Sequence, residues 1–107
     1  MDRQQRLHLF SLAAHRLAVE RLREQPARLI EALGVLQRWR AVAGGPSTCD
    51  RYWDEWDTLL HAGADAVEAA VCIQGDHAAS LRSTSPLGRF ISLAERNRLL
   101  RETPAPS

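Results

Sequence analysis

Apolar residues recur at helical spacing in the first quarter of the chain, between about residues 4 and 24. One stripe at i, i+3, i+4 spacing consists of Leu7, Phe10, Ala14, Leu17 and Ala18. A second stripe, interleaved with His8 and His15, consists of Leu12, Val19 and Leu22. A helix that packs on one side of a core needs only one apolar stripe, and this helix has two. This helix is therefore either enclosed by the rest of the fold or in contact with another chain.

A second long helix is expected to begin at Pro26, because proline suits the first helical position. Its buried seam is predicted to contain Leu29, Ile30, Leu33 and Leu36, with Trp39 beside it. Gly44-Gly45-Pro46 forms a strong stop. Since only a tight turn separates the two long helices, we expect them to pack as an antiparallel hairpin.

Shorter helical segments follow, and each is predicted from a capping residue. Asp50 is expected to cap a helix over about 51–61 that ends at Gly63, and Asp65 a helix closed by Gly75. Asp76 is expected to cap a short segment through Leu81, and Ser85-Pro86 starts a turn. Ser92 and Glu95 have the spacing of a capping box, which opens a last helix to about Arg101. The pattern predicts an all-α single domain over residues 1–102, a long N-terminal helical hairpin followed by about four short helices, with a flexible tail at 103–107.

The charge distribution is uneven although the net charge of the 107 residues is only +1. All fourteen basic residues are arginine. Residues 1–49 carry a balance of +4, residues 50–80 carry −6 and residues 81–107 carry +3. We expect the acidic segment to be neutralised within the fold by the two basic ones. The alternative is that it stays exposed for a basic partner.

Targeting signals and metal-binding cysteine spacings are absent from the sequence. Cys49 and Cys72 form no CxxC motif, the first residues lack the apolar core of a signal peptide, and no 18 apolar residues run together. We therefore expect a cytoplasmic protein with reduced thiols and no membrane contact. No catalytic motif, metal site or cofactor-binding loop is recognisable, so we expect neither an enzyme nor a bound cofactor.

The segment 50–57 holds the densest cluster of aromatic and acidic residues. On a helix, Tyr52, Trp53 and Trp56 lie on one face, and Asp54, Asp57 and later His61 lie on the opposite one. The aromatic face is interpreted first as core, with partner contact as the alternative. The predicted partner-binding set is Asp54, Glu55, Asp57, His61, Tyr52, Trp53 and Trp56.

Nucleic-acid binding is the competing hypothesis. Residues 76–101 contain two short helices joined by a turn, which loosely suggests a helix-turn-helix, and the basic candidates there are Arg96, Arg98 and Arg101. However, the nearby −6 segment would repel phosphate, which argues against nucleic acid as the partner.

The residues Leu81-Arg82-Ser83-Thr84-Ser85-Pro86 and Ser92-Leu93-Ala94-Glu95-Arg96 follow the pattern LRxxSP…SxxER. With Leu7-His8, Arg38-Trp39 and the stretch from Trp56 to Leu60, the chain resembles small uncharacterised bacterial helical proteins. The resemblance implies a partner protein of toxin–antitoxin-like or phage-defence loci. We expect a non-enzymatic, antitoxin-like protein that neutralises a basic protein encoded nearby, with the two long helices as its scaffold or as the seam of a homodimer. The alternative is a small arginine-rich DNA-binding transcriptional regulator.

Overall fold

Local capping interactions set the start of the first and the last helix. Helix α1 (Arg3–Glu24) begins with a capping box in which Asp2 Oδ1 accepts the Gln5 N–H at 2.8 Å and Gln5 Oε1 accepts the Asp2 N–H at 3.1 Å. Helix α6 (Leu93–Glu102) begins with the same arrangement between Ser92 and Glu95. The predicted capping box at Ser92 is thus confirmed.

The computed structural model describes residues 2–103, and four further α-helices lie between the first and the last. They are α2 (Ala27–Ala43), α3 (Asp50–Ala62), α4 (Ala64–Val71) and α5 (Asp76–Ser83), followed by a short 3-10 helix, η1 (Gly88–Phe90). The end of α2 is as predicted, because Gly44 adopts the left-handed conformation with φ of 69°. The all-α prediction is confirmed, since every regular element in residues 2–103 is helical.

Three predicted caps are wrong, because each acid lies inside the helix that it was expected to precede. Asp50 is the first residue of α3, and its Oδ2 instead accepts the Ser47 N–H of the preceding loop at 2.9 Å. Asp65 and Asp76 lie in the first turns of α4 and α5, behind glycine residues at the cap positions. A carboxylate in the first turn still interacts favourably with the helix dipole, which explains why the approximate helix positions were correct.

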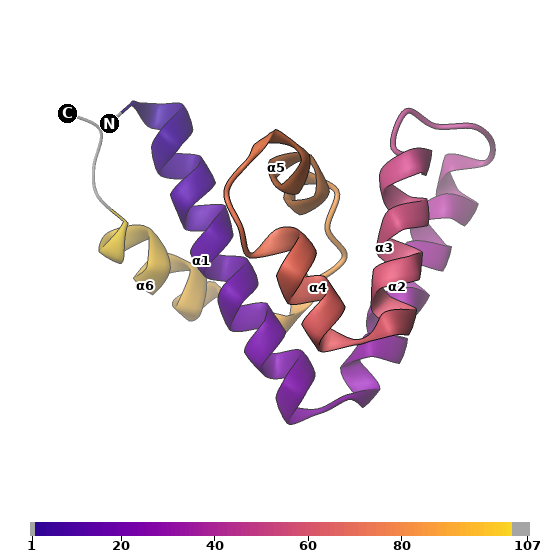
Figure 1. The fold of residues 1–107 in the computed structure, drawn as a ribbon, viewed down its shortest axis with the longest axis horizontal. Helices are drawn as coiled ribbons and strands as arrows, with labels where there is room; N and C mark the ends of the chain where they lie inside the picture. Colours follow the sequence, from indigo (N-terminus) through magenta and orange to yellow (C-terminus); the bar gives the residue numbers. More distant parts are fainter. Residues whose placement is uncertain (1, 104–107) are drawn as a thin grey trace.

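The two long helices diverge from the turn at residues 25–26 and form a V (Figure 1). Helix α2 packs chiefly along α3, while α1 packs against α4 on one side and α6 on the other. Helices α4 and α5 occupy the space between the arms of the V in Figure 1. The predicted antiparallel hairpin is therefore not confirmed, because the two helices separate from their turn instead of packing along their length.

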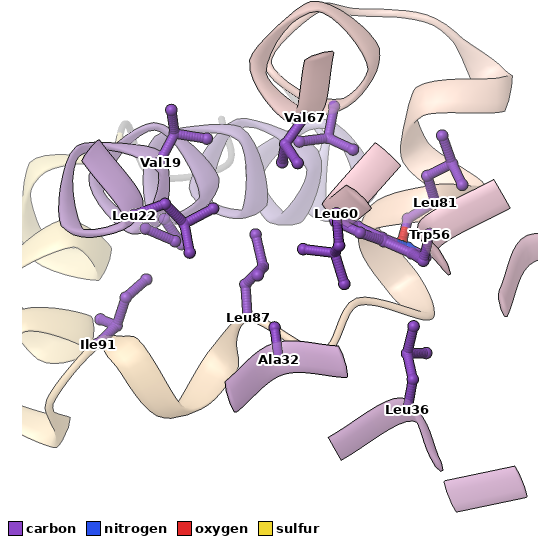
Figure 2. Close-up of a cluster of buried hydrophobic side chains, with 13 residues drawn as sticks. Val19, Leu22, Ala32, Leu36, Trp56, Leu60, Val67, Leu81, Leu87 and Ile91 are labelled. Carbon is purple, nitrogen blue, oxygen red and sulfur yellow. The ribbon is translucent and has the colours of Figure 1, made fainter. Parts of the chain in front are cut away.

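The hydrophobic core joins side chains from both arms of the V and from every segment between them (Figure 2). Its fully buried large members are Val19, Leu22, Leu36, Trp56, Leu60, Val67, Val71, Leu81 and Leu87. Within α1, Leu12, Val19 and Leu22 of the second stripe are all buried. The second stripe is thus covered by the chain itself, which is one of the two arrangements that the two stripes allowed, while Leu7 of the first stripe is 47% exposed.

The chain remains packed as far as the end of α6. Thr103, which was expected to begin a flexible tail, is 8% exposed, and its Oγ1 donates to the Leu99 carbonyl at 2.7 Å. Residues 104–107 of that predicted tail lie outside the described residues, as does Met1. Cys49 and Cys72 are both free thiols. None of the helices in residues 2–103 combines the length and the apolar character needed to cross a lipid bilayer.

Candidate protein-binding surface

The aromatic face of α3 points mainly into the core. Trp56 is completely buried, and its Nε1 donates to the Leu81 carbonyl at 2.8 Å. Tyr52 and Trp53 are half-buried and pack against the same core. Because Trp56 has no exposed surface, its place among the predicted partner-binding residues is corrected: it is a core residue.

Trp53 keeps part of its surface beside a second tryptophan on α2. The ring centroids of Trp39 and Trp53 lie 6.3 Å apart, with a tilt of 40° between the planes. Trp39 is 38% exposed, so the pair forms an apolar area at the surface between the two helices. Sequence reasoning placed Trp39 beside a core seam, because its pairing with Trp53 depends on how α2 and α3 dock.

The acids of α3 lie on the outer side of the helix and contact nearby basic side chains. Asp54 Oδ1 lies 2.8 Å from Arg40 Nη2, and the Asp54 side chain is still 71% exposed. Both Glu55 carboxylate oxygens lie 2.9 Å from His77 Nε2. Asp54 and Glu55 thus each have a partner within the chain, while Asp54 stays accessible to solvent.

Asp57 and His61 interact with each other one helical turn apart. His61 Nδ1 lies 2.8 Å from the Asp57 backbone carbonyl oxygen and 3.6 Å from Asp57 Oδ2. Both side chains are more than half exposed, at 56% for Asp57 and 65% for His61. Of the predicted set, Asp54, Asp57 and His61 are therefore the residues most accessible to a partner.

The two acids of α4 are neutralised by α1. Arg23 of α1 bridges Asp65 and Glu68 of α4, with nitrogen–oxygen distances of 2.7 and 2.9 Å. The hydrogen bond from Arg23 lowers the pKa of Glu68. Together with the Arg40–Asp54 pair, this confirms that basic residues of the first block neutralise part of the acidic segment.

The predicted nucleic-acid residues lie on α6 and are exposed, but their surroundings do not form a helix-turn-helix. Arg96 stacks over the Phe10 ring of α1 at 5.6 Å, and Arg98 Nε lies 3.9 Å from Glu102. Nine residues, 84–92, separate α5 from α6, whereas a helix-turn-helix uses a turn of about three or four. Helix α6 packs on α1, so the suggested motif is not formed.

Structural roles account for much of the LRxxSP…SxxER pattern. Arg82 is only 6% exposed, and its Nη1 donates to the carbonyls of Val71 and Ile73 at 2.8 and 2.7 Å, which caps the end of α4. Ser85 Oγ accepts the Leu87 N–H at 3.1 Å, and Pro86 is buried. These tail residues therefore hold α4, α5 and η1 together.

Arg82 is the residue of interest that sequence reasoning missed. Burial lowers the pKa of its guanidinium. The available signal was its position four residues after Ala78 and directly after Leu81, on the apolar stripe of α5. An arginine on a buried stripe predicts a guanidinium that satisfies backbone carbonyls or binds a ligand.

The described part of the chain offers no cluster of three or more His, Cys, Asp or Glu side chains that could hold a metal ion. No protein-family model, curated protein or solved structure matches this chain. The resemblance stated above therefore remains a prediction that rests on the quoted residues.

Proposed function

We propose that this chain is a non-enzymatic protein-binding protein that contacts a basic partner through the outer surface of α2 and α3. The observation that carries the proposal is that the exposed acids Asp54 and Asp57 lie on the same helix as Trp53. Trp53 in turn packs against the partly exposed Trp39 of α2. Tryptophan anchors surrounded by charged residues are typical of binding hot spots.

The internal partners of these acids do not prevent such a contact. Exposed ion pairs contribute only about 0–1 kcal/mol each, because both charges remain solvated. A cation of the partner can therefore replace Arg40 at Asp54 at little cost, and Asp57 is 56% exposed beside His61. Glu55 is less accessible, with 35% of its side chain exposed, and we assign it a secondary role.

The resemblance to antitoxin-like proteins makes the proposal more specific. In this form the partner is a basic toxin encoded by an adjacent gene, and the carboxylates of α3 occupy the positions of phosphate groups on the toxin surface. Tyr52 and Trp53 then contribute contact area through their exposed edges. The homodimer remains a secondary proposal, because the second stripe of α1 that suggested it is covered within the chain.

The test is co-expression with each protein encoded next to this chain, followed by purification and measurement of the association rate. We expect Asp57→Arg to slow association about tenfold or more at low salt, because charges at an interface rim act mainly on the association rate. Glu102→Arg is the matched control, since Glu102 is similarly exposed but lies at the end of α6. Absence of a complex with any neighbouring product, or equal rates for both variants, would refute the proposal.

DNA binding through Arg96, Arg98 and Arg101 is the alternative, supported by the exposure of all three side chains on α6. Binding of this kind neutralises phosphates and weakens steeply with salt. Gel-shift assays at low and moderate salt distinguish the alternatives: retardation that disappears in Arg98→Glu favours DNA, and no retardation at either salt concentration removes it.

A further inference from the structure

A cavity separates the first turns of α1 from the connection between α4 and α5. Its volume is about 330 Å³, near the lower end of the roughly 300–1,000 Å³ typical of small-molecule sites. Leu9 and Leu12 of α1 form an apolar wall, and the opposite side contains Gln74, Asp76 and Arg82. This space shares no lining residue with the α2–α3 surface proposed above.

The cation that lines this cavity has hydrogen-bonding capacity that the surrounding protein does not use. Both hydrogen bonds of Arg82 to backbone carbonyls come from Nη1, and its buried Nε has no partner within residues 2–103. No carboxylate of the described chain forms an ion pair with it. An unpaired buried charge is costly, and a guanidinium that lines a cavity can bind a carboxylate through charge-assisted hydrogen bonds.

The charge at the rim has the opposite sign. Asp76 is exposed and lines the same cavity, but it does not pair with Arg82. Gln74 and the exposed His8 add polar groups that can hydrogen-bond a ligand. A ligand complementary to these groups has a carboxylate at one end, a short apolar middle part against Leu9 and Leu12, and an ammonium group at the other end.

We propose that the cavity between α1 and the α4–α5 connection binds a small zwitterion, with its carboxylate on Arg82 and its ammonium group near Asp76. The buried guanidinium supplies the stronger interaction, because it is shielded from water. Asp76 is exposed, so its interaction with the ammonium group raises the affinity by a smaller factor. The site is independent of the protein-binding surface, so either proposal can fail without the other.

The probe is γ-aminobutyrate, compared with butyrate and butylamine, which each lack one of its charges. In ¹H–¹⁵N spectra of the labelled protein, we expect γ-aminobutyrate to shift the Arg82 Nε–H signal saturably. Arg82→Lys, which removes that signal, assigns it. Butyrate should bind about two- to fivefold more weakly, since it loses only the exposed interaction, and Asp76→Asn should reduce the preference for γ-aminobutyrate by the same factor. Butylamine should leave the signal unchanged.

Two variants block the cavity without touching the guanidinium. Leu9→Trp fills the apolar wall, and Gln74→Trp fills the opposite side from an exposed loop position, so that one remains informative if the other disturbs folding. Leu93→Trp is the matched control, because Leu93 is 73% exposed on α6. We expect the shift to disappear in folded blocking variants and to persist in the control. A shift that does not saturate, that butylamine reproduces or that survives both blocking variants overturns the proposal.

Discussion

Replacing Trp56 with phenylalanine tests whether the aromatic face of α3 stabilises the fold. The change shortens a side chain that has no exposed surface and removes its Nε1–H donor to Leu81. The Leu81 carbonyl still accepts from the Thr84 backbone N–H at 3.2 Å and from Thr84 Oγ1 at 3.1 Å. The substitution therefore leaves no acceptor unsatisfied, which limits the hydrogen-bond part of the cost.

The magnitude follows from these two contributions. A hydrogen bond whose acceptor retains other partners contributes near the lower end of about 0.5–1.5 kcal/mol. Loss of ring volume in a close-packed core adds about 1–2 kcal/mol, since complete truncation of a buried tryptophan costs about 3–5 kcal/mol. We expect the free energy of unfolding to fall by about 1.5–2.5 kcal/mol and the melting temperature to fall by about 6–20 °C.

The assay is urea unfolding followed by far-ultraviolet circular dichroism, with thermal melts of the same samples. Trp39→Phe is the matched control, because that ring is 38% exposed and its substitution should change stability by no more than about 0.5 kcal/mol. The denaturant slope should be unchanged in both variants, since the surface exposed on unfolding is nearly the same. Equal stabilities of Trp56→Phe and Trp39→Phe would show that Trp56 is not the buried centre of this core.

Two further predictions concern a buried histidine and a left-handed glycine. Burial lowers the pKa of His15, so the unfolded chain binds a proton at a higher pH than the folded chain does. Stability should therefore decrease as the pH falls below about 6.5, and His15→Gln, unlike His8→Gln, should reduce that decrease in urea titrations at several pH values. Gly44→Ala should cost about 1–2 kcal/mol in thermal unfolding, because φ at this position is 69°. Gly45→Ala, at a position without positive φ, should cost clearly less; equal costs would contradict the assignment of the helix end.

Helix boundaries were predictable where the signal is local. The capping box at Ser92 and the stop at Gly44 depend on residues within a few positions, and both are found. The docking of α2 was not predictable in the same way, because a short turn brings two helices near each other without fixing their angle. Whether α2 follows α1 or α3 depends on side chains that meet only in the folded chain, such as Trp39 and Trp53.

The candidate surface was likewise predictable only in part, because its pairings form between residues far apart in the sequence. The uneven charge blocks correctly predicted that part of the acidic segment is neutralised internally, but not which arginine meets which acid, since Arg23 and Asp65 are 42 positions apart. The wheel of α3 separated Trp56 from Asp54 and Asp57, yet it could not show that Trp56 alone is fully buried. Arg82 could have been noticed on the apolar stripe of α5, whereas its cavity requires α1 to be in place.

The enclosure of α1 between α4 and α6 has a consequence for synthesis on the ribosome. Arg21 pairs with Glu95, 74 positions later, and Arg6 Nη2 donates to the Leu100 carbonyl at 3.0 Å across 94 positions. The first helix to leave the ribosome is thus the last to be fully covered. Contacts of such long separation delay folding, and until they form the apolar face of α1 stays open to aggregation or to a chaperone.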